Sequence, residues 1–80
     1  MKNSKLKKII ESLIFSSSSP ISIKELRNFF SDEKISLKLL EELISELQIQ
    51  YLNSGVNLKK VSTGYRFQVS EECNEWVTNF

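Results

Sequence analysis

The sequence is poor in the residues that most catalytic and metal sites use. Its 80 residues include no histidine, one cysteine, one proline and two glycines. The lack of histidine excludes Cys/His and Ser/His nucleophile pairs and removes the imidazole ligands of zinc sites. Cys73 has no partner for a disulfide within the chain, and Gly55 and Gly64 are too few for a phosphate-cradling loop. We therefore expect no metal and no cofactor.

Two kinds of catalytic pair need no histidine. Composition leaves a Ser/Lys pair open. Adjacent carboxylates also occur, at Glu41 with Glu42 and at Glu71 with Glu72. Neighbouring side chains on a helix diverge by about 100° and do not readily converge on one bond. We assign both pairs to solvent-exposed helix faces and predict that the protein is not an enzyme.

Long apolar runs are missing as well. No segment approaches the roughly 20 apolar residues that span a bilayer, and the lysine-rich start lacks the apolar core of a signal peptide. We expect a single domain over residues 1–80, inside the cell and away from the membrane. Eleven Lys and Arg against ten Asp and Glu leave a net charge of +1, which supplies no global attraction for nucleic acid. A domain this small has a marginal core, which favours help from a partner chain.

Apolar residues recur at helical spacing in three segments. The first helix is predicted from about Ser4 to Phe15, and it ends at a serine run, 16–19, followed by Pro20. After a short extended piece over 20–22, Ser22 and Glu25 have the spacing of a capping box. A third helix is predicted from a Ser36 cap to about residue 51.

Residues 56–70 have the pattern of a β-hairpin. Tyr65, Phe67 and Val69 alternate with polar residues, and Gly64 can turn at positive φ. Three helices closed by a hairpin predict a winged helix, a mainly α fold with the order helix, short strand, helix, helix, strand, strand, helix.

The last helix is predicted to begin at a Ser70 cap. Its apolar stripe comprises Cys73, Trp76, Val77 and Phe80. We expect this stripe to bury against protein, with Cys73 inert. Because the stripe is still apolar at Phe80, we also expect the natural protein to continue beyond it.

Local charge weighs against specific DNA binding. A DNA-binding winged helix normally places its third helix in the major groove, where Glu41, Glu42 and Glu46 would face phosphates against one base, Lys38. The hairpin is basic, at Lys59, Lys60 and Arg66, and these residues are candidates for weak phosphate contacts. Basic residues on a hairpin also discourage strand association. A DNA-binding winged-helix transcriptional regulator stays the alternative.

The apolar surface of the first two helices is broader than one small core needs. We predict that part of it forms a dimer or partner interface, with five candidate residues: Ile10, Leu13, Ile14, Phe29 and Phe30. A protein-binding module is therefore the favoured function.

Taken in order, four parts of the chain resemble the amino-terminal domain of the segregation and condensation protein B family. They are Ile9–Phe15, Pro20–Leu26, Leu39–Tyr51, and Gly64–Phe67 leading to Trp76 and Val77. The resemblance spans nearly all 80 residues. This sequence departs from the family pattern at residues 16–19, where an acidic or glycine-containing turn is common, so the contacts of that loop do not carry over.

The resemblance implies a non-catalytic scaffold of a bacterial condensin-like complex in chromosome condensation and segregation. It implies a homodimer that binds the kleisin subunit (ScpA) and, through it, an SMC ATPase. Contact with DNA would be indirect or weak, and no small-molecule substrate or membrane is involved. A second winged helix would follow this one, and the protein would be cytoplasmic and associated with the nucleoid.

Overall fold

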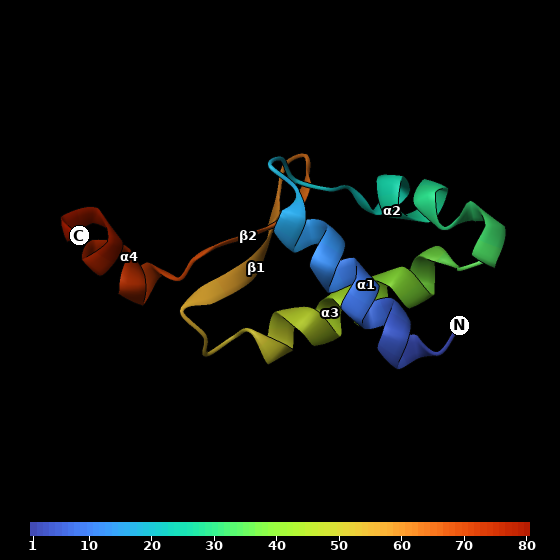
Figure 1. The fold of residues 1–80 in the computed structure, drawn as a ribbon, viewed down its shortest axis with the longest axis horizontal. Coiled ribbons are helices and arrows are strands. Elements are labelled where there is room, and N and C mark those ends of the chain that lie inside the picture. The colour runs from blue at the N-terminus through green and yellow to red at the C-terminus, as the bar shows by residue number, and fades with distance from the viewer.

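The structure is a computed structural model that describes all 80 residues. In Figure 1 the first helix crosses the third beside the hairpin, and the last helix projects from one end of the molecule. In chain order the elements are α1 (Asn3–Ser16), α2 (Ile23–Phe29), a short 3-10 turn η1 (Ser31–Glu33), α3 (Leu37–Gln50), β1 (Val56–Val61), β2 (Gly64–Val69) and α4 (Glu71–Asn79). The predicted order of helices and strands is confirmed.

Serine caps begin two of the helices as predicted. At α2, the Ser22 hydroxyl accepts a hydrogen bond from the backbone N–H of Glu25, and the Glu25 carboxylate accepts one from the N–H of Ser22, each at 3.1 Å. At α3, the Ser36 hydroxyl accepts from the N–H of Leu39 at 3.1 Å. These bonds satisfy amide groups that have no partner within a helix. The local sequence therefore determines where α2 and α3 begin.

The hairpin is antiparallel, with Val56 opposite Val69 and Leu58 opposite Phe67. Gly64 has φ +151°, in the region that favours glycine. Two backbone hydrogen bonds join Ile21 to Tyr65, at 2.9 and 2.8 Å. The extended piece after α1 thus pairs with the wing and holds it against the helices.

The core lies where α3 contacts α1 and α2, and the wing closes one side of it. Ten hydrophobic side chains are buried there: Leu6, Ile10, Ile14, Leu26, Phe30, Leu40, Leu43, Ile44, Leu47 and Leu58. Only Leu58 comes from the hairpin, so the core belongs mainly to α1, α2 and α3.

Helix α4 lies outside this core and contributes no buried residue. Trp76 is 75% exposed, Val77 57% and Phe80 fully exposed. We expected this stripe to bury against protein, and within this chain it does not. The reason is the path of the backbone, because extended Ser70 (φ −63°, ψ 151°) carries the chain past the base of the hairpin and away from the other helices (Figure 1).

The predicted cap of α4 is also wrong in its chemistry. Ser70 occupies the N-cap position, but its side chain accepts no hydrogen bond from the helix. Its hydroxyl is buried and has no partner. The start of α4 therefore depends on backbone bonds, including those from Ser70 N–H to the Gly55 carbonyl and from Cys73 N–H to the Ser70 carbonyl.

Candidate interaction surfaces

The five residues predicted as a partner interface divide between the core and the surface. Ile10 is 0% exposed, Ile14 2% and Phe30 4%. Leu13 is half-buried, and Phe29 is 67% exposed. A side chain without exposed surface cannot contact another chain in this conformation, so Ile10, Ile14 and Phe30 are corrected to core residues. The predicted interface narrows to Leu13 and Phe29.

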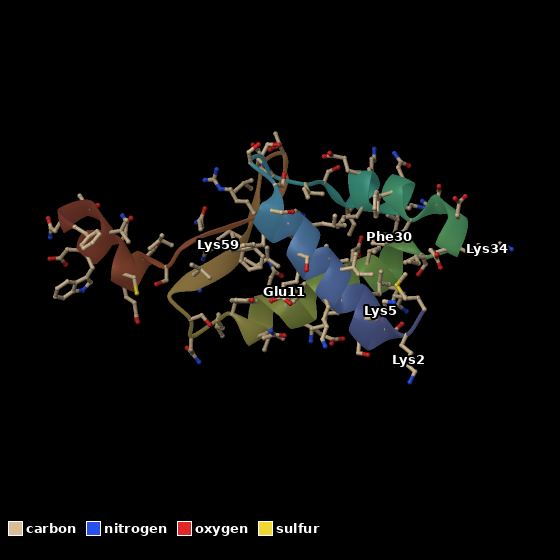
Figure 2. All side chains as sticks on the ribbon, in the orientation of Figure 1. Lys2, Lys5, Glu11, Phe30, Lys34 and Lys59 are labelled. Atoms are coloured by element: carbon tan, nitrogen blue, oxygen red, sulfur yellow. The ribbon has the colours of Figure 1, made fainter.

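Phe29 and Phe30 illustrate why the sequence did not distinguish core residues from surface residues. They are consecutive at the end of α2, and their rings pack edge to face with centroids 5.0 Å apart. Figure 2 marks Phe30 between α2 and α3, where it belongs to the buried core. Neighbours on a helix point in directions about 100° apart, so a covering helix can bury one and leave the other exposed.

The predicted basic cluster on the wing is divided between the two faces of the hairpin. Lys59 lies opposite Arg66, and Lys60 lies opposite Tyr65. Because successive side chains of a strand point to opposite faces, Lys59 and Arg66 share one face while Lys60 lies on the other. All three are exposed, and the guanidinium Nε of Arg66 donates to Gln68 Oε1 at 3.1 Å. A single phosphate-binding cluster of these three residues is not formed.

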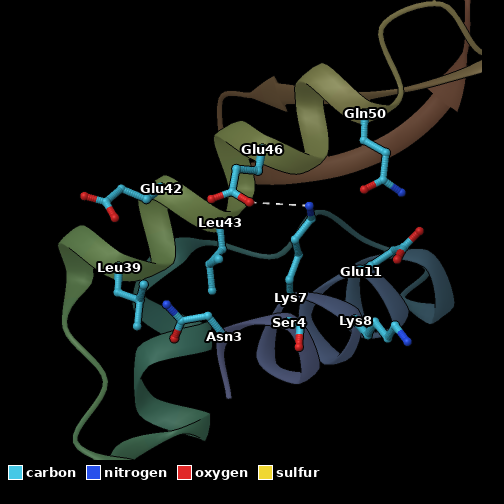
Figure 3. A pocket seen from close by; sticks show the side chains of 10 residues that line it. All are labelled: Asn3, Ser4, Lys7, Lys8, Glu11, Leu39, Glu42, Leu43, Glu46 and Gln50. Atoms are coloured by element: carbon cyan, nitrogen blue, oxygen red, sulfur yellow. Dashed lines mark hydrogen bonds and ion pairs between the residues drawn. The ribbon is translucent and has the colours of Figure 1, made fainter. Parts of the chain in front are cut away.

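The outer surface of α3 keeps its acidic character in the structure. Glu41, Glu42 and Glu46 are exposed, together with the one base, Lys38. A polar groove of about 390 Å³ runs along the surface between α1 and α3. In this groove Lys7 Nζ lies 3.4 Å from Glu46 Oε1 (Figure 3). The helix that would enter a DNA groove thus presents carboxylates to solvent.

A hydrogen bond that the sequence did not reveal ties α1 to the end of α3. The Tyr51 hydroxyl donates to the Glu11 carboxylate. This hydrogen bond, with smaller contributions from burial and from the nearby negative charge, raises the pKa of Tyr51 above its usual 10.0. The Tyr51 ring also packs edge to face on Phe67, at a centroid distance of 4.9 Å, so the contact extends to the wing.

The remaining surface is rich in large apolar side chains. The residues concerned are Met1, Phe15, Phe29, Ile49, Leu52, Val56, Trp76, Val77 and Phe80. They lie on or beside every α-helix and at the start of the wing. No group of three metal-ligating side chains gathers anywhere, and no helix has the length and apolar character that a membrane span requires.

Three helices, a short pairing strand and a two-stranded wing define a winged-helix domain, and its exposed apolar side chains suit contact with protein. The predicted fold class is confirmed by the likeness to solved structures described below. The model of the family "Segregation and condensation complex subunit ScpB" matches residues 8–80, and the chain belongs to this family. Membership in a family of non-catalytic segregation and condensation subunits confirms the prediction that the domain is not an enzyme.

Two relatives are similar to this chain in sequence. The chain is 36% identical over 70 residues to a segregation and condensation protein B homolog of Coxiella burnetii, covering 86% of this chain and 34% of the relative. It is 33% identical over 79 residues to segregation and condensation protein B of Clostridioides difficile, covering 96% of this chain and 44% of the relative. The chain thus spans less than half the length of these relatives.

Two solved structures share the fold. ScpB from Mycobacterium tuberculosis superposes with a TM-score of 0.85 at 16% identity, over 99% of this chain and 49% of that one. A conserved hypothetical protein from Chlorobium tepidum gives a TM-score of 0.80 at 26% identity, over 96% of this chain and 48% of that one. In both, the shared fold occupies about half of the solved chain.

Proposed function

We propose that this domain is a scaffold module of a condensin-like SMC–kleisin complex in chromosome condensation and segregation. It acts by pairing with a second copy and by binding the kleisin subunit (ScpA), through which it contacts the SMC ATPase. It works in the cytoplasm at the nucleoid, and a second winged helix follows it in the natural protein. Family membership supports the general role.

The observation that carries the proposal is the number of large apolar side chains at the surface. Phe29, Trp76 and Phe80 are at least two-thirds exposed. Each aromatic side chain buries about 150–250 Å² when it enters an interface. At about 25 cal/mol per Å², covering even one of them contributes several kcal/mol before the costs of association. Such a surface suits partner proteins.

Phe29 and Leu13 are the predicted interface residues that a partner can reach. Phe29 lies on α2, and Leu13 lies on the exposed side of α1 next to Ile9. We assign Phe29 to the kleisin and Leu13 to the second copy of the domain. In this assignment the kleisin binds at α2 and the second copy of the domain binds at α1.

Kleisin binding is tested by isothermal titration of a purified kleisin fragment into the chain. Phe29→Ser should weaken binding by about tenfold or more, as expected when a central aromatic contact is lost. Lys24→Ser, at an exposed position on the same helix, is the matched control and should leave the affinity unchanged. Wild-type chain that does not bind the fragment would refute the kleisin role.

The alternative, a DNA-binding regulator, is favoured by one observation, the basic pair of Lys59 and Arg66 on one face of the wing. It predicts sequence-selective duplex binding at physiological salt that is lost on Lys59→Glu with Arg66→Glu and kept on Lys60→Glu. Our proposal predicts negligible affinity for all three proteins in a fluorescence anisotropy titration. Tight, selective binding with that mutational pattern would favour the regulator.

A further inference from the structure

Helix α4 carries an apolar stripe that the rest of the chain does not cover. Cys73, Trp76, Val77 and Phe80 follow at i, i+3, i+4 and i+7; Cys73 is half-buried, and the other three are exposed. The helix is also acidic, with Glu71, Glu72 and Glu75 and no base. A partner for α4 therefore needs an apolar floor with positive charge beside it.

Such a surface exists on the exposed side of α1. A shallow depression of about 370 Å³ runs along it, lined by Lys5, Lys8, Ile9, Ser12, Leu13 and Ser16. Half-buried Ile9 and Leu13 form its apolar part. From Lys5 to Ser16 it extends over roughly 16 Å of helix, and the nine residues of α4 span about 14 Å. The two surfaces match in length.

The charges of the two surfaces are complementary. Ten acids are present, three of them on α4, so residues 1–70 carry 11 bases and 7 acids, a net charge of +4 beside the −3 of α4. Lys5 and Lys8 lie in the first turns of α1, where the helix dipole disfavours cations. Neither forms an ion pair, because the single ion pair of the chain joins Lys7 to Glu46. An acidic helix beside them would supply the missing counter-charge.

We propose that α4 docks into the α1 depression of a second copy, and that the two copies exchange their α4 helices reciprocally. The inference rests on the proposed function, because it specifies how the proposed homodimer forms. The chain leaves the wing and enters α4 at Ser70, whose side chain holds no bond to α4. Reciprocal exchange of an identical element is a low-cost route to a symmetric dimer.

Area and charge both favour reciprocal exchange. Trp76 and Phe80 together bury about 300–500 Å². With the α1 surface that they cover, and with both copies counted, the buried total reaches about 1,200–2,000 Å², the size of a stable interface. Docking of a single α4 would bury half as much. Pairing α4 with α4 would bring together two helices that each carry three acids and no base, so like charges would repel without any compensating ion pair.

A cross-linking experiment distinguishes these arrangements. Chains carrying Cys73→Ser with Val77→Cys are mixed with chains carrying Cys73→Ser with Ser12→Cys, and are oxidised mildly. We expect a disulfide-linked heterodimer. The control replaces the second chain by one that carries Cys73→Ser with Ser45→Cys. Ser45 is an exposed residue of α3 outside the depression, so this pair should give no heterodimer. Preferential linking of two Val77→Cys chains, or no linking at all, overturns the inference.

Sedimentation equilibrium of the wild-type chain and its variants supplies the second test. Trp76→Ser should raise the dimer dissociation constant at least about tenfold. Lys5→Glu with Lys8→Glu should also weaken the dimer, and Glu72→Lys in the same chain should restore it. Glu75→Lys is the matched control, because Glu75 lies about 150° around α4 from the middle of the stripe, and should not restore it.

The outcomes separate this inference from the proposed function. A dimer that is insensitive to Trp76→Ser overturns the exchange of α4 and leaves homodimerisation standing. A wild-type chain that stays monomeric at concentrations up to about 1 mM overturns both the exchange and the homodimer.

Discussion

At Gly64 the wing passes so close to the strand after α1 that no side chain fits between them. A Cβ atom at this position would lie 2.4 Å from the carbonyl carbon and oxygen of Ile21 and 2.7 Å from the nitrogen of Ser22. The obstructing atoms are backbone, and they are held by the hydrogen bonds between Ile21 and Tyr65. Glycine is therefore required by space as well as by its φ of +151°.

Gly64→Ala should lower the free energy of unfolding by at least about 2 kcal/mol, through backbone strain and loss of the close approach. Urea denaturation followed by circular dichroism measures the change. Gly55→Ala is the control, because a Cβ there would meet only Cys73 Sγ, at 4.0 Å. Equal effects of the two substitutions would contradict the steric explanation.

Tyr51 gives the domain a pH dependence in the alkaline range. Its pKa in the folded state is raised, chiefly by the hydrogen bond to Glu11. The protonated hydroxyl is therefore favoured by folding, and its contribution to stability is fully present below the ordinary value of 10.0. It is lost as the pH rises from there through the raised pKa. The neutral Tyr51 phenol is the stabilising form, because it donates the hydrogen bond to Glu11.

The difference in unfolding free energy between wild type and Tyr51→Phe should consequently shrink as the pH rises above 10.0. Urea titrations at several alkaline pH values measure it, and taking the difference cancels the titration of lysines common to both proteins. A difference that stays constant or grows over that range would show that the hydrogen bond to Glu11 does not favour the protonated form.

At the scale of single elements, three serines occupy N-cap positions with different results. Ser22 and Ser36 accept hydrogen bonds from their helices, and Ser70 does not. The first two satisfy free amides, while the buried hydroxyl of Ser70 has no partner. The same residue type at the same helical position thus has opposite energetic consequences.

Ser22→Ala should destabilise the domain by about 1 kcal/mol, because it removes half of the capping box of α2. Ser70→Ala should leave stability unchanged or raise it slightly, because it removes an unsatisfied buried hydroxyl. Thermal denaturation of both variants compares them directly. A larger loss for Ser70→Ala than for Ser22→Ala would indicate that the Ser70 hydroxyl does bond in solution.

Elements with local signals were predictable from the sequence, and their packing was not. The capping spacing of Ser22 with Glu25 and the alternation around Phe67 depend on residues close in the chain, and both are confirmed. Whether Ile14 faces the core or a partner depends on where α3 lies, and periodicity carries no information about that. The bond between Tyr51 and Glu11 joins residues 40 positions apart, and no local pattern indicates it.

Considered as a whole, the molecule has a compact part and a projecting part. It extends 45 Å along its longest axis against 21 and 18 Å across, and α4 occupies one end (Figure 1). All ten core residues precede α4. The direction of α4 was not predictable, because its apolar stripe has the same pattern whether it enters a core or stays outside.

Deleting residues 71–80 should therefore change the free energy of unfolding of the monomer by less than about 1 kcal/mol. Dilute samples in urea, below the concentration at which copies associate, provide the measurement. Leu58→Ala is the contrasting variant, because its side chain is 3% exposed and its loss should cost about 2–5 kcal/mol. Unfolding of the shortened chain would show that α4 contributes to the core in solution.

The bridge between Ile21 and Tyr65 joins points separated by more than half of the chain, through two reciprocal backbone hydrogen bonds. Neither amide can exchange its proton with solvent unless the wing lifts from the strand after α1. After each exchange rate is corrected for the intrinsic rate of its amide, Ile21 and Tyr65 should consequently give the same free energy of opening. These two amide protons report when the wing opens, independently of the fraying of any helix.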